Sequence, residues 1–261
     1  MNNQHGKARL EDFLERLPDN PHRLLMLDYD GTLAPFQEDR ESAGLYPGVR
    51  EHLKDILQGT NTRTVIISGR GAYNVRRLLG IDPNPEIWGS HGCERLYPDG
   101  HYELEVKNKA DLEYLAKAKE WIAEQKDSEQ YEIKPLGVAL HWRGLSLEKM
   151  KQLKYNTVRK WKQYTEQSNL EFAEFDGGIE LKSVGFTKGD AVKILIEELQ
   201  RHLAAAYLGD DLTDEDAFKE IRGRGLGILV RKEWRPTAAE VHLIPPGQLI
   251  EFLKKWYLKT K

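Results

Sequence analysis

Short apolar runs alternate with segments of helical period at both ends of this chain, and this alternation constrains the fold more than any other feature. Near the start, the strand-like runs 24–27 and 64–67 are followed by helical segments at 49–58 and 73–79. Runs that are apolar on both faces are typical of a parallel sheet with helices on each side. The pattern predicts an α/β fold with a doubly wound parallel sheet.

The same alternation returns near the end of the chain, so two separated stretches are expected to form one sheet. The helices and strands predicted there are 189–202, 204–208, 214–222, 226–230 and 246–257. We therefore assign residues 22–104 and 184–261 to a single core. The polar residues 1–21 are interpreted as an N-terminal extension with a short helix and a turn.

Between the two stretches the pattern changes to that of a small α+β unit. The helices and strands predicted there are 108–126, 131–133, 137–142, 147–167, 170–175 and 179–182. Residues 105–183 are therefore expected to form a second domain that is inserted into the core, as a lid over the edge of its sheet.

Charge and cysteine content exclude several classes of function. Acidic and basic residues are mixed along the 261 residues, with a formal net charge of −3, so no basic stripe indicates a nucleic-acid partner. No apolar run is long enough to cross a bilayer, and the polar N-terminal residues are not expected to act as a secretory signal. With its single cysteine, Cys93, the chain is expected to be a soluble, cytoplasmic monomer that acts on a small molecule.

The most informative motif, Asp28-Tyr29-Asp30-Gly31-Thr32, directly follows the first predicted strand. Open α/β sheets place their functional sites at this carboxyl edge. Asp28 can supply a nucleophilic carboxylate and an oxygen ligand for Mg²⁺, and the Asp30 backbone carbonyl can reach the same ion. The Asp30 carboxyl can protonate a leaving alcohol and then deprotonate water. The alternative is an Asp-Gly turn that only ends a strand.

Ser68 ends the second predicted strand, in Ser68-Gly69-Arg70. Its hydroxyl, together with the backbone amides at the start of the next helix, could hold a phosphate oxygen. Serine is also an ordinary helix N-cap, so this motif has a purely structural alternative.

Lys188 opens a predicted helix for which Thr187 and Asp190 have the spacing of a capping box. A lysine at this end of a helix opposes the macrodipole. Its position therefore favours a functional role, bridging Asp28 and a bound phosphate, over that of a solvated surface lysine.

The segment 209–216 carries five acids in seven residues after a predicted strand. Thr213 and Asp216 have capping-box spacing, which accounts for the last acids. Asp210 and Asp211 precede that cap, at a position that suits a metal ligand and its supporting partner. Asp210 is expected to contact Mg²⁺, with Asp211 and Asp214 close behind it.

These four strand-end motifs together supply a nucleophile, an acid-base group, a metal site and a cation, which are the parts that phosphoryl transfer needs. In these same residues the chain resembles the haloacid dehalogenase (HAD) superfamily of phosphatases. Within it, the chain resembles the trehalose-phosphatase family over nearly all residues from 22 onward. The motifs that carry the narrower likeness are 28–35, 91–94, Lys134, 141–143, 178–182 and 209–218.

The resemblance implies a Rossmann-like core with an inserted α/β cap between the serine and lysine motifs. It implies hydrolysis of trehalose 6-phosphate through an aspartyl phosphate, with Mg²⁺ as cofactor. Gly69 and Arg70 are expected to contact the substrate, and His91 and Glu94 to lie at its entrance, although a structural turn also accounts for the last two.

The resemblance further implies that four cap residues grip the sugar and its phosphate: Lys134, His141, Arg143 and Glu180. Strand alternation would place Ala139, His141 and Arg143 on one face, opposite Val138, Leu140 and Trp142. The alternative is a solvated sheet face of mixed charge.

Three other functions stay open. One is a HAD phosphatase for another sugar phosphate, such as a sucrose, mannosylglycerate or glucosylglycerate phosphate, and another is a phosphomutase. The third is a non-catalytic phospho-sensor, against which Asp30 and the insertion argue. At this length no synthase domain is expected, so the chain would only dephosphorylate.

Overall fold

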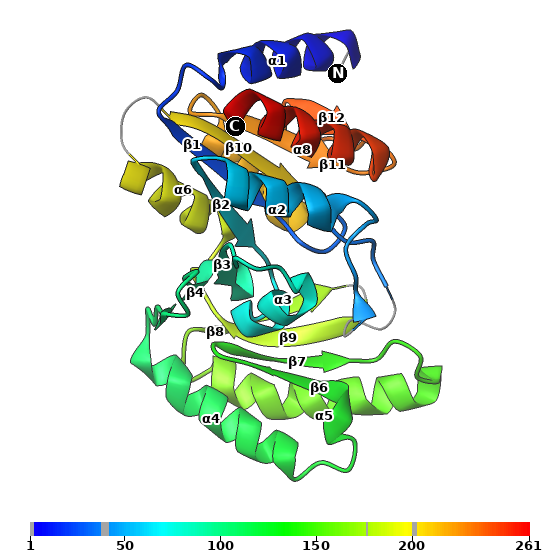
Figure 1. Cartoon of the computed structure of the whole chain (residues 1–261). Helices are drawn as coiled ribbons and strands as arrows, with labels where there is room; N and C mark the ends of the chain where they lie inside the picture. Colours follow the sequence, from blue (N-terminus) through cyan, green and yellow to red (C-terminus); the bar gives the residue numbers. More distant parts are fainter. Residues whose placement is uncertain (1–2, 38–41, 176, 200–202) are drawn as a thin grey trace. The chain divides into compact units, whose positions relative to one another are not determined.

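The computed structural model describes residues 3–37, 42–175, 177–199 and 203–261. They form two compact units. The first unit comprises Met1–Glu103 and Thr187–Lys261, and the second comprises Leu104–Phe186. Figure 1 shows the elements of both along the chain.

The first unit contains most of a sheet with the strand order β12-β11-β10-β1-β2-β3-β4-β5. The six strands from β12 to β3 are parallel, and β4 is antiparallel to β3. The strands are β1 (His22–Leu27), β2 (Thr62–Ile67), β3 (Glu86–Gly89), β4 (Glu94–Leu96), β5 (Tyr102–Leu104), β10 (Leu203–Gly209), β11 (Leu226–Val230) and β12 (Val241–Leu243). The predicted doubly wound α/β fold is confirmed.

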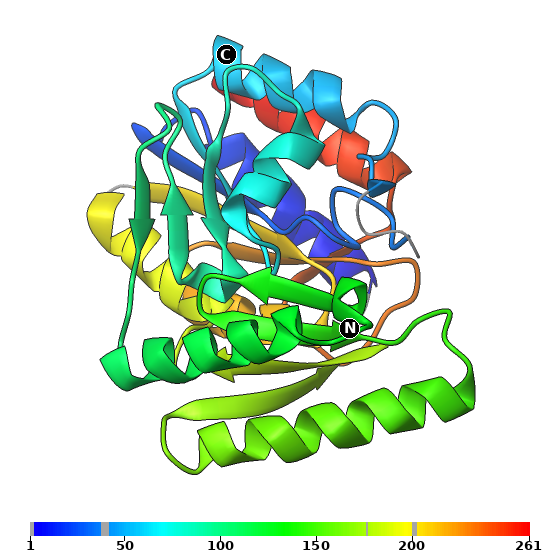
Figure 2. The same ribbon diagram turned by 90° about the horizontal axis from the view of Figure 1, so that it is seen from below.

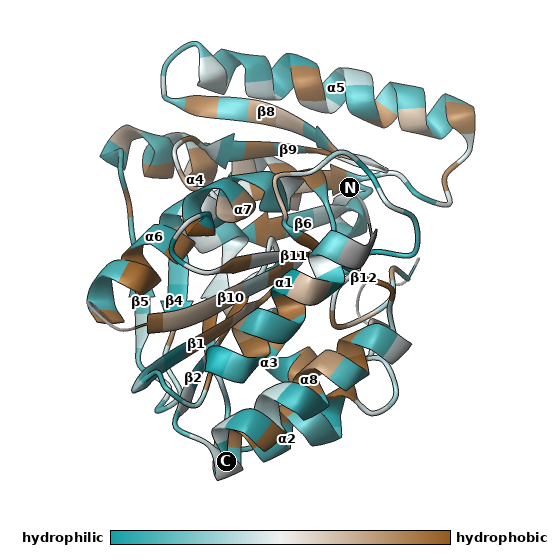
Figure 3. Cartoon of the chain, turned by 90° about the horizontal axis from the view of Figure 1, so that it is seen from above, coloured by the Kyte–Doolittle hydropathy of each residue, from teal (hydrophilic) through white to brown (hydrophobic). Residues whose placement is uncertain are grey.

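Helices cover both faces of this sheet. They are α1 (Asn3–Arg16), α2 (Val49–Gly59), α3 (Ala72–Leu79), α6 (Lys188–Leu199), α7 (Glu215–Ile221) and α8 (Gly247–Thr260), with 3-10 turns at Ser90–Gly92 (η2) and Leu212–Asp214 (η4). Leu25 and Leu27 pack toward α1, α2, α3 and α8, whereas Leu24 and Met26 pack toward α6 and α7. Because alternate residues of β1 enter different cores, residues 24–27 are all apolar and buried, whereas the strand begins with the polar His22 and Arg23. Figure 3 shows the hydropathy of the helices and strands.

The N-terminal segment contributes to the larger of these two cores. Leu14 of α1 and Leu17 just after it are buried there, together with Trp256 of α8. α8 in turn lies beside α2 (Figures 1 and 2). Residues 3–21, expected as an extension, therefore lie within the first unit.

The second unit has an antiparallel sheet with the order β6-β7-β9-β8. Its elements are α4 (Lys109–Ala123), η3 (Ser128–Gln130), β6 (Tyr131–Lys134), β7 (Gly137–His141), α5 (Leu147–Thr165), β8 (Leu170–Phe175) and β9 (Gly178–Ser183). Cross-strand partners share a face. Val138 and Leu181 therefore lie on the apolar face, and Ala139 and Glu180 lie on the other.

The predicted ends of several elements differ from the structure by up to three residues. β7 ends at His141, because the backbone N–H of Trp142 donates to the Gly177 carbonyl at 2.9 Å and a turn follows. The prediction that Arg143 extends the strand face of Ala139 and His141 is therefore wrong. α6 ends at Leu199, and the predicted end of that helix, at 200–202, lies outside the described residues.

No helix in the described part of the chain combines the length and the apolar character that a membrane crossing requires.

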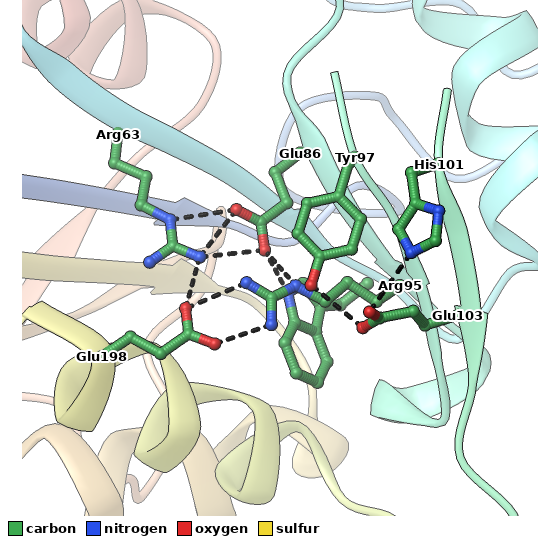
Figure 4. Close-up of polar contacts among 8 residues, drawn as sticks. Arg63, Glu86, Arg95, Tyr97, His101, Glu103 and Glu198 are labelled. Carbon is green, nitrogen blue, oxygen red and sulfur yellow. Dashed lines mark hydrogen bonds and ion pairs between the residues drawn. The ribbon is translucent and has the colours of Figure 1, made fainter. Parts of the chain in front are cut away.

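A network of charges fixes the C-terminal end of α6 to the sheet (Figure 4). Glu86, at the start of β3, accepts hydrogen bonds from Arg63 Nε at 2.9 Å, Arg95 Nε at 2.8 Å and Trp88 Nε1 at 2.8 Å. Glu198, in the last turn of α6, accepts from both arginines at 2.7 Å. The network therefore joins three strands to the end of α6 that is opposite Lys188.

We expect Glu86→Ala to lower the free energy of unfolding by about 3 kcal/mol, because it removes a buried carboxylate from two largely buried guanidiniums. Urea denaturation measures this loss. Glu103→Ala is the control, since Glu103 is exposed and contacts the exposed His101 and Tyr97, and it should cost less than about 1 kcal/mol. Equal losses in the two variants would contradict a structural role for the network.

Candidate active site

Three acids meet where β1 and β10 end side by side. The two strands pair in parallel from His22↔Leu203 to Leu27↔Leu208, and Asp28 N–H donates to the Leu208 carbonyl at 2.8 Å. One carboxylate oxygen from each of Asp28, Asp210 and Asp214 lies within 4.8 Å of the other two, and all three residues are buried. The structure thus brings together three of the acids that the sequence placed at a metal site.

Lys188 connects two of these acids. Its Nζ lies 2.7 Å from Asp28 Oδ1 and 2.7 Å from Asp214 Oδ1, and the residue is only 3% exposed. The predicted capping box is confirmed, because Thr187 N–H donates to Asp190 Oδ2 and Asp190 N–H donates to Thr187 Oγ1. Lys188 therefore begins α6 with its ammonium group directed at the nucleophile candidate.

Asp214 is the most heavily bonded acid of the group. Besides Lys188, Tyr207 Oη donates to its Oδ1. The backbone N–H groups of Asp210 and Asp211 donate to its Oδ2 at 3.0 and 2.9 Å. With four donors on its two oxygens, Asp214 is suited to positioning its neighbours, whereas Asp28 and Asp210 are better placed to coordinate an ion.

The predicted cap between Thr213 and Asp216 is wrong. The capping box lies between Asp211 and Asp214, because the 3-10 turn η4 precedes α7 and moves the start of the helical segment upstream. Asp211 is exposed, and its carboxylate accepts the Asp214 backbone N–H.

Gly31 allows the nucleophile loop to approach Asp210. Its φ of +81° is one that side chains rarely adopt, and a Cβ there would lie 2.2 Å from Asp210 Oδ2. In the same loop, Thr32 Oγ1 donates to Asp28 Oδ2 at 3.2 Å. Thr32 therefore orients the Asp28 carboxylate, and Gly31 leaves room for the Asp210 carboxylate beside the loop.

The electrostatics of the site favour a bound cation. Burial, together with the charges of Asp214 and Asp30, raises the pKa of Asp28 to about 7 against the opposing effect of Lys188. Burial and the charges of Asp28 and Asp214 raise the pKa of Asp210 to about 9. Burial alone would lower the pKa of Lys188, but Asp214 and Asp28 raise it overall. Crowded carboxylate oxygens of this kind suit a hard divalent cation.

Asp30 is bound to Arg70. Arg70 Nε and Nη2 donate to the two oxygens of Asp30 at 2.6 and 2.7 Å, and Nη1 donates to Asn74 Oδ1 at 3.2 Å. Arg70 is buried, whereas a quarter of the Asp30 side chain is exposed. Asp30, the candidate acid-base group, is thus hydrogen-bonded through both carboxylate oxygens to Arg70, a candidate substrate ligand.

The remaining candidates of the first unit lie around the end of β2. The buried Ser68 Oγ accepts the Arg70 N–H at 3.1 Å. Gly69 lies against the imidazole ring of His91, whose φ is +62°. Glu94 is buried and accepts hydrogen bonds from Ala72 N–H, Ser90 Oγ and Tyr102 Oη. These contacts favour the structural alternative for Glu94.

In the second unit, three of the four predicted sugar ligands form pairs within the sheet, and the fourth lies beyond the strand. Lys134 Nζ donates to Glu180 Oε1 at 2.9 Å, and both residues are largely buried. His141 Nε2 lies 3.0 Å from Glu132 Oε2. Arg143 is exposed and its side chain packs over Gly177.

Two residues that contact the acids of the site, Thr32 and Tyr207, were not predicted from the sequence. Thr32 lies inside the quoted motif, so its proximity to Asp28 offered a signal. Tyr207 is an interior residue of β10, and nothing local distinguishes it from a core tyrosine. Burial and Asp214 raise its pKa well above the usual value, so it remains a hydrogen-bond donor.

Comparison with known proteins gives consistent matches. A sequence profile of the trehalose-phosphatase family matches residues 26–243. The probable trehalose-phosphate phosphatase C of Arabidopsis thaliana is 30% identical over 267 residues, which covers 91% of this chain and 78% of that protein. Two longer proteins of Mycobacterium tuberculosis also match at 30% identity, and the chain spans only 19% of their length.

Solved structures show the same fold. The C-terminal domain of C. albicans trehalose-6-phosphate phosphatase superposes with a TM-score of 0.73 at 21% identity, covering 95% of this chain and 96% of that one. A haloacid dehalogenase-like hydrolase from B. subtilis gives a TM-score of 0.56 at 16% identity, over 88% and 98% of the two chains. The HAD-like fold is therefore confirmed.

The raised pKa values predict how the stability of the metal-free protein depends on pH. Both carboxyls have higher pKa values folded than unfolded, so their stabilisation is complete below about pH 4 and is lost as the pH rises through about 7 and about 9. We expect the free energy of unfolding to fall between about pH 5 and 8. The slope is up to about 1.4 kcal/mol per pH unit for each carboxyl that stays protonated.

Denaturant titrations at several pH values test this. Asp210→Asn should flatten the slope, because it removes one of the two groups, whereas Asp216→Asn on the exposed face of α7 should not. An unchanged slope in Asp210→Asn would mean that the crowded acids do not cause the pH dependence of the free energy of unfolding.

Proposed function

Because the chain belongs to the trehalose-phosphatase family, we propose that it hydrolyses trehalose 6-phosphate to trehalose and inorganic phosphate through an aspartyl phosphate on Asp28. The observation that carries this proposal is the buried Lys188 ammonium, 2.7 Å from the carboxylates of Asp28 and Asp214. This arrangement offers an oriented nucleophile and a cation for the transferred phosphate in one place.

Mg²⁺ is the cofactor in this proposal. The side chains of Asp28 and Asp210 and the backbone carbonyl of Asp30 would hold it, with Asp214 and Asp211 fixing the loop around Asp210. When bound, Mg²⁺ neutralises charge on the phosphate and on the crowded carboxylates.

In the first displacement, a carboxylate oxygen of Asp28 attacks phosphorus. An O–P bond forms, and the bond between phosphorus and the oxygen of the sugar breaks. The Asp30 carboxyl donates its proton to that oxygen, so trehalose leaves as a neutral alcohol. Lys188 stabilises the negative charge on the phosphoryl oxygens.

In the second displacement, water attacks the aspartyl phosphate. The Asp30 carboxylate, now without its proton, accepts one from the water as its oxygen bonds to phosphorus. The bond between phosphorus and Asp28 breaks, which restores the carboxylate and releases inorganic phosphate. Asp30 is thereby protonated for the next cycle.

Arg70 connects substrate binding to this proton transfer. Its guanidinium holds both oxygens of Asp30, and an arginine so placed also suits a phosphate dianion. In the proposed cycle the phosphate competes with Asp30 for Arg70. The Asp30 carboxyl is then released to take up its proton and turn toward the leaving oxygen.

We propose that residues 104–186 select the sugar through the face of the four-stranded sheet that carries Glu180. Its polar pairs, Lys134 with Glu180 and His141 with Glu132, provide hydrogen-bond donors and acceptors for sugar hydroxyls. Arg143 beyond the strand provides an exposed cation.

The test is phosphate release from a panel of sugar phosphates, including those of sucrose, mannosylglycerate and glucosylglycerate. We expect the highest kcat/KM with trehalose 6-phosphate, and a loss of at least about a thousandfold in Asp28→Asn, because the nucleophile is removed. Asp99→Asn, at an exposed turn, is the control. Equal rates across the panel would exclude trehalose 6-phosphate as the preferred substrate. Binding of the sugar phosphate without turnover would indicate a phospho-sensor.

Arg143→Ala separates sugar selection from chemistry. We expect kcat/KM for trehalose 6-phosphate to fall by about 10- to 100-fold through loss of a charged hydrogen bond, while hydrolysis of a small aryl phosphate stays unchanged. Steady-state kinetics on both substrates measure this, with the exposed Arg159→Ala on α5 as control. Equal losses of kcat/KM on both substrates would show that Arg143 does not contribute to sugar specificity.

A further inference from the structure

The loop that carries Asp210 is held by an arginine that takes no part in the proposed chemistry. Arg235 lies in the segment after β11. Its Nη2 donates to the carbonyl oxygen of Asp211 at 2.6 Å, and its Nε donates to that of Asp210 at 3.4 Å. Arg231 Nη1 reaches the same Asp210 carbonyl at 3.3 Å. Two guanidiniums thus converge on two consecutive peptide groups.

Arg235 is itself fixed in place. Its Nη1 donates to the Pro236 carbonyl at 2.9 Å and forms an ion pair with Glu215. Glu215 also accepts hydrogen bonds from Thr237 Oγ1 at 2.8 Å and from Ala238 N–H at 2.7 Å. The side chains of Arg235 and Glu215 are 15% and 17% exposed, so the contacts are largely shielded from water.

The backbone N–H groups of the same two residues are held as well. The N–H groups of Asp210 and Asp211 donate to Asp214 Oδ2, while their carbonyls accept from Arg235. Both backbone groups of Asp210 and of Asp211 are therefore bonded, which leaves the Asp210 side chain as the part of the residue directed to the acid cluster.

We infer that Arg235 is a positioning residue for metal binding: it fixes the backbone of Asp210 and Asp211 so that the Asp210 carboxylate faces Asp28. The inference rests on the proposed function for the identity of the ion. A lysine could not replace Arg235, because it has a single nitrogen, whereas the planar guanidinium presents donors to several acceptors at once.

The test is the Kd for Mg²⁺, measured by calorimetry and by the rise in unfolding temperature with Mg²⁺ concentration. We expect Arg235→Lys to raise this Kd by about tenfold and Arg235→Ala by up to about a hundredfold. Glu215→Gln, which weakens the support of Arg235, should raise it by a few fold. At saturating Mg²⁺ the KM for the sugar phosphate should not change.

Arg224→Lys is the matched control, because Arg224 also pairs with a glutamate, Glu220, at the end of α7. The Kd of this variant for Mg²⁺ should equal that of the parent protein. An unchanged Kd in folded Arg235→Lys and Glu215→Gln overturns the inference, even if Arg235→Ala does not fold.

The failures of the two proposals are distinguishable. A parent protein that hydrolyses the sugar phosphate but binds no Mg²⁺ overturns this inference and the proposed cofactor, while the proposed substrate and the nucleophile Asp28 stand. A parent that binds Mg²⁺ but hydrolyses no sugar phosphate overturns the proposed function, and the Kd ratios still decide the role of Arg235.

Discussion

The contact between the Lys188 ammonium and the carboxylates of Asp28 and Asp214 is the interaction on which the rest of the site depends. It joins the first residue of α6 to the residue after β1 and to the last residue of η4. Removing three charges from water costs much free energy, and only close mutual contacts compensate for it. The fold therefore has to hold all three elements at hydrogen-bond distance.

The charges of this group do not balance within the protein. Asp210 adds a third buried carboxylate to the one ammonium of the cluster, and the pKa values of Asp28 and Asp210 rise accordingly. Local rules of stability are often broken where function requires it. Here the broken rule leaves a place for positive charge, which a bound divalent cation would fill.

Two other groups of buried charges among the described residues are paired. The network of Glu86, Glu198 and two arginines fixes one end of α6, far along the helix from Lys188. In the second unit, Lys134 and Glu180 pair within one sheet face. Each unit therefore has its own buried ion pairs, whereas around Lys188 three buried carboxylates surround one ammonium.

Local patterns in the sequence determined much of this protein. Apolar runs and helical periods predicted the α/β sheet and most helices, and the cap of Thr187 and Asp190 placed Lys188 at a helix start. Short elements such as β3 and β12, with four and three residues, carry too little periodicity to be found this way.

The tertiary structure alone decided which groups meet. Lys188 lies 160 residues from Asp28 and 26 from Asp214, and the pairing of Asp30 with Arg70 spans 40 residues. The Asp211 cap and the contacts of Arg235 also depend on how separate segments pack. Periodicity and capping depend on residues close together in sequence, so they can show that a side chain occupies an unusual position. Strand order and register determine which distant side chains it contacts.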